Sequence, residues 1–135
     1  MRTVEDVIEF VYDKLMSQGK QALDKDGMGC MYRAPDGCKC AVGWLIPDED
    51  YVPSMEGLKS YSGVIRKLLC KQFDEEIVMT VLPHLQSIHD TYRRHIPNNS
   101  FRQHIHIAFM NFIEIHNYRF TRPIELKGVE HYEVY

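Results

Sequence analysis

The sequence lacks the short motifs that usually identify a reaction. It contains no HExxH, no GxSxG, no Walker phosphate-binding loop and no complete GxGxxG. Each of these motifs places side chains or backbone N–H groups around a metal ion, a scissile bond or a phosphate. Without them, nothing local in the sequence favours catalysis. We therefore expect a protein that is not an enzyme and that uses no cofactor.

Long apolar runs and a strong charge of either sign are also missing. No run of about eighteen apolar residues occurs, so the sequence predicts no membrane-spanning segment. The chain has 16 Lys and Arg against 19 Asp and Glu, a formal net charge of −3. That balance argues against a general nucleic-acid binder and is too small for a DNA mimic. The acid-containing, amphipathic N-terminus is unlike a secretory leader, and four nearby cysteines suggest free thiols, so we expect a cytoplasmic protein.

Helical spacing of apolar residues predicts most of the secondary structure. At 135 residues without an internal repeat, the chain is expected to form one domain, residues 1–135. The first helix is predicted over 3–18, from a Thr3 cap to a stop at Gly19. A short helix is expected after Ser60 or Ser62. Another is expected from Asp74 to about 93, and Pro83 must kink or divide it because proline has no N–H to donate.

The last predicted helix, Phe101–Asn117, is apolar around much of its circumference. Ser100 and Gln103 form a capping box at its start. A helix of this kind lies in the centre of a core or forms half of a dimer contact, and so a homodimer through Phe101–Asn117 is one interpretation. The tail Phe120–Tyr135 is expected to add an edge strand or to run over the surface.

A β-hairpin is predicted around Ala34–Gly37, where proline, aspartate and glycine each favour a turn. The flanking segments are Cys30–Arg33 and Cys38–Trp44. The register we expect pairs Tyr32 with Cys40 and Cys30 with Val42, which puts the sulfur-rich side chains on one face. Arg33 and Lys39 then lie opposite each other on the other face. The predicted fold class is α+β, with about four helices packed around one small antiparallel hairpin or sheet.

Cationic and aromatic side chains gather near this predicted hairpin. Tyr32, Arg33, Lys39 and Trp44 are our candidate residues for binding a ligand or partner. Arginine pairs bidentately with phosphate or carboxylate, and tyrosine and tryptophan supply rigid apolar contact. Such a group suits an anionic, nucleotide-like small molecule or an acidic protein surface. The alternative is that Arg33 and Lys39 form a solvated outer face of the hairpin.

A metal site is a weaker possibility. Cys30, Cys38 and Cys40 could share one hairpin face, with a fourth ligand from Cys70 or a histidine. The alternative is that these thiols pack as small apolar side chains. His89-Asp90 is similar to the dyad of HD-type metal-dependent phosphohydrolases. That reading fails, because those sites need a histidine far upstream and an aspartate downstream, and no aspartate follows Asp90. We therefore interpret His89 as structural and expect no metal ligands.

Several segments together resemble a family of small phage and prophage proteins. The family pattern is C-x-Y-R, a short turn, K-C-A-x-G-x-L-I-x-D, then E-G and L-Q-x-x-H-D. The resemblance covers roughly residues 1–92, and Cys38 and Trp44 depart from it. On this basis we divide the domain into a family-like core, 1–95, and a C-terminal helix and tail, 96–135. The segments that carry the pattern are Cys30–Arg33, Lys39–Gly43, Leu45–Asp48, Glu56–Gly57 and Leu85–Asp90.

The resemblance implies a context rather than a mechanism, because the family brings no established activity. A phage context favours a small accessory protein that works by binding. The function we expect is a non-enzymatic protein that binds and inhibits a host factor, such as an antiviral defence component, in the cytoplasm of a bacterial host. The alternatives are a sponge that sequesters an anionic nucleotide-like molecule and, third, a metal-dependent enzyme.

Overall fold

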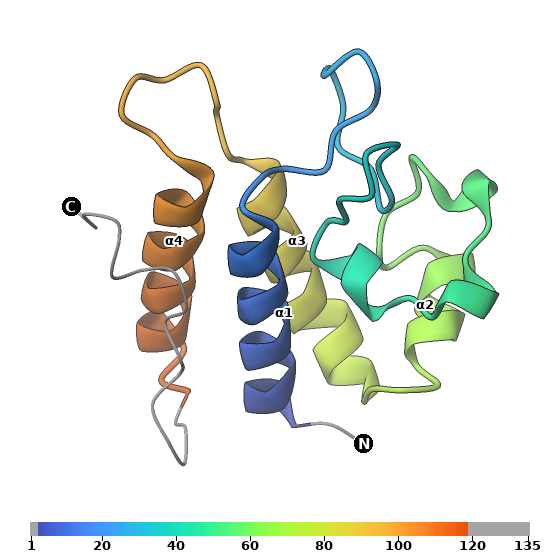
Figure 1. The fold of residues 1–135 in the computed structure, drawn as a ribbon. Coiled ribbons are helices and arrows are strands. Elements are labelled where there is room, and N and C mark those ends of the chain that lie inside the picture. Colours follow the sequence, from blue (N-terminus) through green and yellow to red (C-terminus); the bar gives the residue numbers. More distant parts are fainter. Residues whose placement is uncertain (1–2, 119–135) are drawn as a thin grey trace.

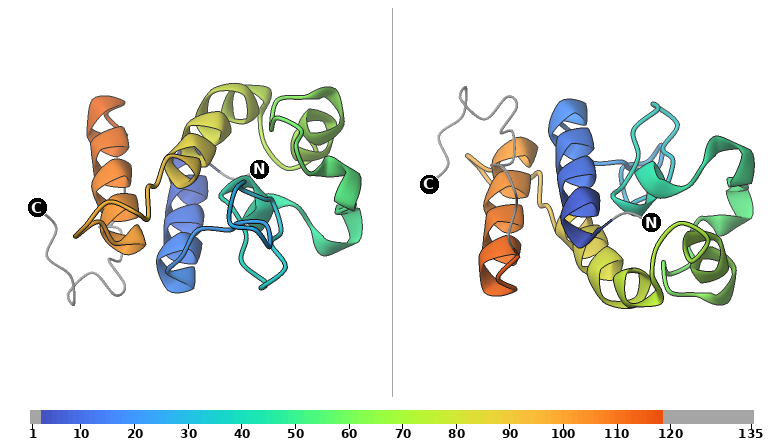
Figure 2. Two further views of the ribbon diagram at one scale, coloured as in Figure 1. Left: turned by 90° about the horizontal axis from the view of Figure 1, so that it is seen from above. Right: turned by 90° about the horizontal axis from the view of Figure 1, so that it is seen from below.

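The structure is a computed structural model, and it describes residues 3–118. Four α-helices form in this part of the chain: α1 (Val4–Gln18), α2 (Gly63–Leu69), α3 (Leu82–Asp90) and α4 (Phe101–Ile115). Helix α4 packs against α1 and α3, whereas α2 lies on the opposite side of the molecule from α4 (Figures 1 and 2). The long connection between α1 and α2 crosses the molecule from one of these sides to the other (Figure 1). It contributes most of the functional candidates described below.

Helix α1 begins and ends where the sequence predicts. Thr3 caps it: the Thr3 hydroxyl accepts the N–H of Asp6, and the Asp6 carboxylate accepts the N–H of Thr3. These two bonds satisfy donors that the first helical turn leaves free. Gly19 ends the helix in the left-handed conformation, at φ 75°, where glycine carries no steric penalty. The prediction of a helix over 3–18 is confirmed.

Pro83 divides the predicted third helix, as expected. Residues Ile77–Val81 form a π-helical turn, η4, and α3 begins directly after it at Leu82. Proline fits the first turn of an α-helix because the N–H it lacks would have no intrahelical partner there. Apolar side chains of both segments face inward, among them Ile77, Val81 and Leu85. The α3 helix is thereby held so that its last turn faces the loop before α2.

Helix α4 serves mainly as core. Its residues Phe101, Ile105, Phe109 and Phe112 are buried in the single large apolar cluster of the domain. Tyr12 of α1 packs edge-on against Phe109, with ring centroids 5.5 Å apart. Ile115 on the same helix is exposed. The core interpretation therefore accounts for most of the apolar surface of this helix, and a dimer through Phe101–Asn117 stays a prediction.

The predicted sheet is not confirmed, because residues 3–118 contain no β-strand. The turn itself is present: the Gly37 N–H donates to Ala34 O at 3.0 Å, and Gly37 has φ 91°. Arg33 and Lys39 form one isolated antiparallel bridge beside it. Pairing stops there because the chain turns at Ala41 and enters a 3₁₀ helix, η1 (Val42–Leu45). A strong turn sequence thus produces a tight loop without the strands.

The predicted register beyond this bridge is wrong. Cys30 pairs with Leu23, in a second isolated bridge, and not with Val42. Val42 is the first residue of η1, and its N–H donates to the side chain of Gln86 at 2.9 Å. The apolar run after Cys38 resembles a strand in sequence, but its backbone hydrogen bonds go to α3 and to a helical turn.

No helix within residues 3–118 has the length and apolar character needed to cross a membrane. The predicted edge strand of Phe120–Tyr135 lies outside the described residues.

Candidate functional site

A cleft of about 510 Å³ opens between α3 and the connection that precedes α2. Three segments far apart in the sequence line it: Cys30–Tyr32, 56–61 and the inner face of α3. These include residues from three of the segments that carry the family resemblance. The residues that line the cleft include Cys30, Tyr32, Glu56, Leu58, Tyr61, Gln86 and Asp90. A concave site with a few convergent polar groups is the usual form of a binding site.

Glu56 fixes the cleft wall formed by residues 30–33. Its two carboxylate oxygens accept the backbone N–H of Tyr32 at 2.8 Å and that of Arg33 at 3.1 Å. The hydroxyl of Tyr51 donates to the same carboxylate at 2.6 Å. The Tyr32 hydroxyl in turn donates to the carbonyl oxygen of Leu58. Three donors bind the Glu56 carboxylate, so it holds this stretch of backbone in place.

Gln86 and Asp90 lie one helical turn apart on α3 and point into the cleft. The Gln86 amide oxygen accepts the Val42 N–H, while its Nε2 donates to Asp90 Oδ1 at 3.2 Å and Oδ2 at 3.3 Å. Asp90 remains partly exposed, with 39% of its side-chain surface accessible. Gln86 therefore links η1 to Asp90, the more exposed of the two carboxylates that line the cleft, Glu56 being the other.

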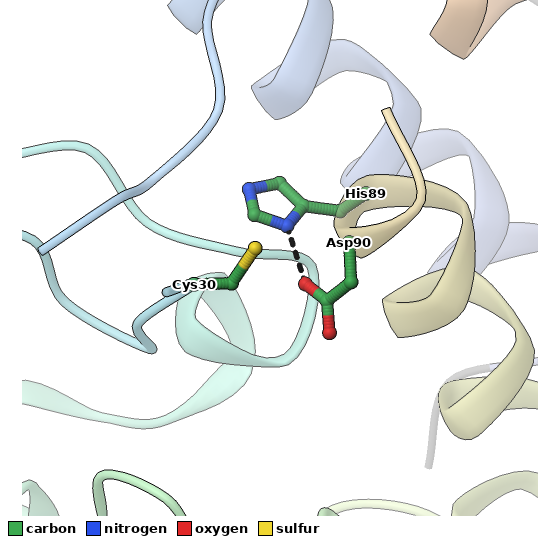
Figure 3. A group of neighbouring side chains, drawn as sticks. All are labelled: Cys30, His89 and Asp90. Carbon is green, nitrogen blue, oxygen red and sulfur yellow. Dashed lines mark hydrogen bonds and ion pairs between the residues drawn. The ribbon is translucent and has the colours of Figure 1, made fainter. Parts of the chain in front are cut away.

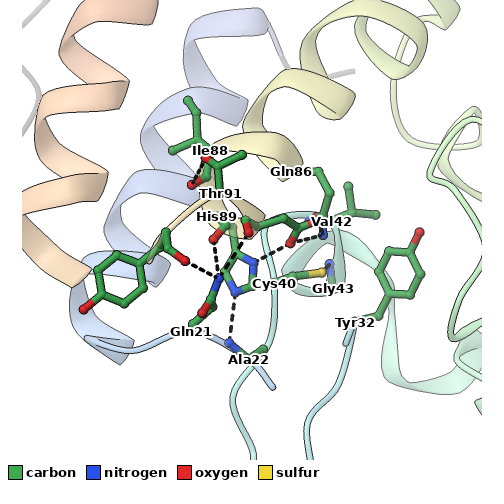
Figure 4. A network of polar contacts seen from close by, with 12 residues as sticks. Gln21, Ala22, Tyr32, Cys40, Val42, Gly43, Gln86, Ile88, His89 and Thr91 are labelled. Carbon is green, nitrogen blue, oxygen red and sulfur yellow. Dashed lines mark hydrogen bonds and ion pairs between the residues drawn. The ribbon is translucent and has the colours of Figure 1, made fainter. Parts of the chain in front are cut away.

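His89 is fully buried, and both of its ring nitrogens have partners (Figure 4). The backbone N–H of Ala22 donates to Nε2 at 2.9 Å, and Nδ1 lies 2.7 Å from Asp90 Oδ1. Because Nε2 accepts a hydrogen bond, it carries a lone pair, and the neutral ring then carries its proton on Nδ1. That proton is donated to Asp90. His89 therefore orients Asp90 and ties the connection after α1 to the end of α3.

Gln21 strengthens the same junction. Its side-chain Nε2 donates to the carbonyl oxygen of His89 at 3.0 Å, with longer contacts to the carbonyl oxygens of Asp90 and Tyr92 at 3.4 Å (Figure 4). The last carbonyls of a helix lack intrahelical donors, so this amide acts as a cap for α3. Two consecutive residues, Gln21 and Ala22, thus bind the helix end that carries His89 and Asp90.

Cys30 faces Asp90 across the cleft (Figure 3). Burial raises the pKa of the Cys30 thiol to about 12, and the charge of Asp90, its hydrogen bond with the thiol and the charge of Asp24 add to the effect. The thiolate is the nucleophilic form of cysteine, and a raised pKa keeps the thiol protonated at neutral pH. His89 is positioned to donate to Asp90 rather than to accept a proton from Cys30. The trio resembles a Cys-His-Asp nucleophile in composition only.

The same three side chains are the one group of potential metal ligands found within residues 3–118. One ligand atom each of Cys30, His89 and Asp90 lie within 4.8 Å of one another. A metal ion would need a lone pair on His89, yet the Nε2 lone pair is taken by Ala22 and Nδ1 carries the proton that Asp90 accepts. Cys30 and Asp90 alone fall short of the three or four protein ligands usual for zinc. The residues present fit a hydrogen-bonded clamp better than a metal centre.

The predicted cysteine trio does not come together. Cys38 lies in a small buried cluster with Ala22 and Ala34, whereas Cys40 is fully buried in the main core. The Gly43 N–H donates to the Cys40 sulfur at 3.4 Å, and burial raises the pKa of this thiol to about 12. Cys30 groups with α3 instead. Within residues 3–118 these three thiols do not form a group of potential metal ligands, so the zinc alternative for Cys30, Cys38 and Cys40 gains no support.

Three of the four predicted binding residues lie together. Arg33 Nη2 is 2.8 Å from Asp48 Oδ1, and Lys39 Nζ is 3.9 Å from the same oxygen. Lys39 Nζ also lies 4.6 Å from the centre of the Trp44 ring. Tyr32 belongs to the cleft instead, with its hydroxyl bonded to the Leu58 carbonyl oxygen. The predicted group is thus split between two regions, and Asp48 already neutralises part of its positive charge.

Sequence reasoning missed the groups that build the cleft. Glu56, Gln86 and Gln21 contact backbone atoms 23 to 71 residues away, and no local spacing in the sequence predicts such contacts. The His89-Asp90 pair was visible in the sequence. Its partners, Ala22 and Cys30, were not.

Comparison with known proteins adds no assignment: no protein-family model, no curated protein and no solved structure matches this chain.

Proposed function

We propose that the protein is a non-enzymatic binding protein of phage type that binds and inhibits a host factor, a component of antiviral defence. The cleft lined by Cys30, Tyr32, Leu58, Tyr61 and Asp90 is the surface through which it acts. The observation that carries the proposal is the state of three polar side chains in this cleft: Tyr32, Glu56 and Gln86 each make hydrogen bonds within the chain. Such groups can shape a surface but are not poised for a reaction.

The residues at the edge of the cleft favour a protein as the binding partner over a small molecule. Exposed apolar side chains concentrate in residues 52–64, the segment that leads into α2. Leu58 and Tyr61 belong to this set and line the cleft. Exposed aromatic and aliphatic side chains beside a concave surface are typical of protein interfaces, where burying them stabilises the complex. The exposed apolar residues of this segment are Val52, Leu58, Tyr61 and Val64.

The carboxylate of Asp90 suggests which kind of side chain the partner places in the cleft. Its carboxylate is partly exposed inside the cleft, and its neutral neighbour His89 does not balance its charge. A lysine or arginine side chain of the partner would form a charge-assisted hydrogen bond with it, in a setting already shielded by the cleft walls. We therefore propose that the bound host segment combines an apolar side chain for Leu58 and Tyr61 with a basic one for Asp90.

The proposal can be tested with phage infection of bacterial strains that each carry one defence system. Expression of the wild-type chain should restore plaque formation in one such strain, and the purified chain should bind a purified component of that system in calorimetry. The Leu58→Ser and Tyr61→Ser variants should weaken that binding, each by about ten-fold, because partly exposed anchors contribute on the order of 1–2 kcal/mol.

Met28→Ser is the matched control, because Met28 is exposed and lies away from the cleft lining. It should behave like the wild-type chain. Equal binding by Leu58→Ser, Tyr61→Ser and Met28→Ser would remove the cleft from the interface. Failure of the chain to protect phage against every defence system tried would contradict the proposed function itself.

A further inference from the structure

We infer that Arg33, Lys39 and Trp44 form an anion-binding site that the chain's own Asp48 occupies in the free protein. The ligand is a phosphate group, taken up when Asp48 moves away. This site lies on a different surface from the cleft and does not depend on the proposed function. The contacts between these residues support an anion-binding site, as well as their chemical types.

Asp48 occupies the site as a ligand would. Its Oδ1 lies 2.8 Å from Arg33 Nη2 and 3.9 Å from Lys39 Nζ, yet 82% of the Asp48 side chain is exposed. The cations beneath it are much less accessible, at 19% for Arg33 and 24% for Lys39. An exposed carboxylate on a surface turn gains little from such a pair. Displacing it therefore costs little.

The basic residues are fixed more firmly than the acid. Arg33 Nη2 also donates to the carbonyl oxygen of Ile46 at 2.8 Å, and the guanidinium stacks over the Tyr51 ring at 4.7 Å. Lys39 Nζ is held over the Trp44 ring at 4.6 Å. A preformed guanidinium with a neighbouring ammonium matches the oxygens of a phosphate, which carries more charge than a carboxylate and has more acceptor oxygens.

The site also has a surplus of hydrogen-bond donors. Arg33 Nε and Trp44 Nε1 are buried N–H groups that find no acceptor within the described residues. Lys14 Nζ lies 5.1 Å from the Trp44 ring and forms no ion pair with a described carboxylate. Unsatisfied buried donors are costly, and an oxygen-rich anion is the chemical class that relieves this deficit.

A groove beside Trp44 gives room for the rest of a phosphate-bearing molecule. It has a volume of about 690 Å³ and lies between α1 and the 36–38 turn, lined by Phe10, Lys14 and Trp44 among others. Asp13 and Asp36 also line the groove, so the charged end of a ligand is placed at Arg33 and Lys39 instead. Glu49 and Asp50 follow Asp48 on the same turn and keep wild-type affinity low while that turn is in place.

Trp44 is the single tryptophan of the chain, so its fluorescence reports directly on this site. We would titrate the full-length protein with phosphate, AMP and adenosine, at constant ionic strength set with sodium chloride. Asp48→Asn should tighten phosphate binding by about three- to five-fold, because the competing internal anion is removed. Adding Lys39→Gln to Asp48→Asn should abolish this gain.

Glu49→Gln is the matched control, because it removes one acidic charge from the same turn without removing a contact to Arg33 or Lys39. The site is supported if Asp48→Asn tightens binding clearly more than Glu49→Gln does. Equal effects of the two variants, or no change of Trp44 emission with phosphate or AMP in any folded variant, would overturn the inference. Tighter binding of AMP than of phosphate, with none of adenosine, would identify a nucleotide as the source of the phosphate.

Discussion

The backbone N–H of Ala22 and the Nε2 of His89 are joined by a 2.9 Å hydrogen bond inside the core, although 67 residues separate them in the chain. This bond sets the tautomer of His89, and the tautomer sets the direction of the bond to Asp90. A single buried contact thereby decides which group the cleft exposes at this position. It presents an oriented carboxylate and not a free imidazole base.

The first prediction concerns His89 itself. His89→Ala should lower the free energy of unfolding by about 3 kcal/mol, because it leaves the Ala22 N–H buried without a partner and opens a cavity. Chemical denaturation followed by circular dichroism measures this change. His95→Ala, at an exposed histidine, serves as the control and should change stability by less than about 0.5 kcal/mol. A similar small effect at His89 would show that the bond contributes little.

The second prediction concerns the reactivity of Cys30. Cys30 is exposed as a residue, yet the pKa of its thiol is raised, so the thiol should react with iodoacetamide at pH 8 at least about ten-fold more slowly than a free cysteine. Asp90→Asn removes the neighbouring negative charge, one of the causes that hold the proton on the thiol, so alkylation should become faster. Peptide mapping by mass spectrometry separates Cys30 from the other thiols. Rapid alkylation of wild-type Cys30 near neutral pH would favour the enzyme alternative instead.

The helices were predictable from the sequence because their determinants are local. Thr3 with Asp6, and then Gly19, mark the ends of α1 through contacts within a few residues. Pro83 divides the third helical segment for a reason that is also local, its missing N–H. The Ala34–Gly37 turn formed where predicted on the same grounds.

The sheet and the cleft were not predictable, because tertiary contacts decide them. The segment after Cys38 has strand-like residues, but Gln86 on α3 takes the Val42 N–H that a strand would use. Likewise, Glu56 and Tyr32 are 24 residues apart, and only the folded chain brings them together. Arg33 and Lys39 were predicted to lie side by side, and they do, but the covering Asp48 follows from the path of the loop.

The third prediction tests Glu56 as the clamp of the cleft wall. Glu56→Ala should speed amide hydrogen exchange at Tyr32 and Arg33, since both N–H groups lose their acceptor. Stability should fall by about 2–3 kcal/mol, because hydrogen bonds to a charged group are among the stronger ones. Exchange measured by NMR resolves the two amides. Unchanged protection at both positions would mean that the wall holds without Glu56.

The fourth prediction concerns pH. Burial lowers the pKa of His106, whose Nδ1 lies 2.8 Å from the Tyr12 hydroxyl between α4 and α1. Below the ordinary histidine pKa of about 6.5, the unfolded chain therefore binds a proton that the folded chain does not. Stability from this site is fully present above about pH 6.5 and is lost as the pH falls from there through the lower pKa of the folded chain. Denaturation at several pH values should show a smaller acid loss for His106→Asn than for the wild-type chain. If the stability of His106→Asn and that of the wild-type chain changed with pH in parallel, His106 would not be the source of the acid loss.

The fifth prediction compares two glycines. Gly43 lies in η1 against residue 32, and a Cβ there would clash with the carbonyl oxygen of Tyr32 and lie 2.9 Å from its carbonyl carbon. Both contacts are to backbone that Glu56 holds in place, so Gly43→Ala should destabilise the fold by about 3 kcal/mol or more. Gly63→Ala, at the first residue of α2, meets open space and should be neutral or slightly stabilising, because alanine favours helix. Thermal melts of the two variants make the comparison. Equal melting temperatures would show that η1 can move away from Tyr32, and the cleft wall would then be less rigid than its contacts suggest.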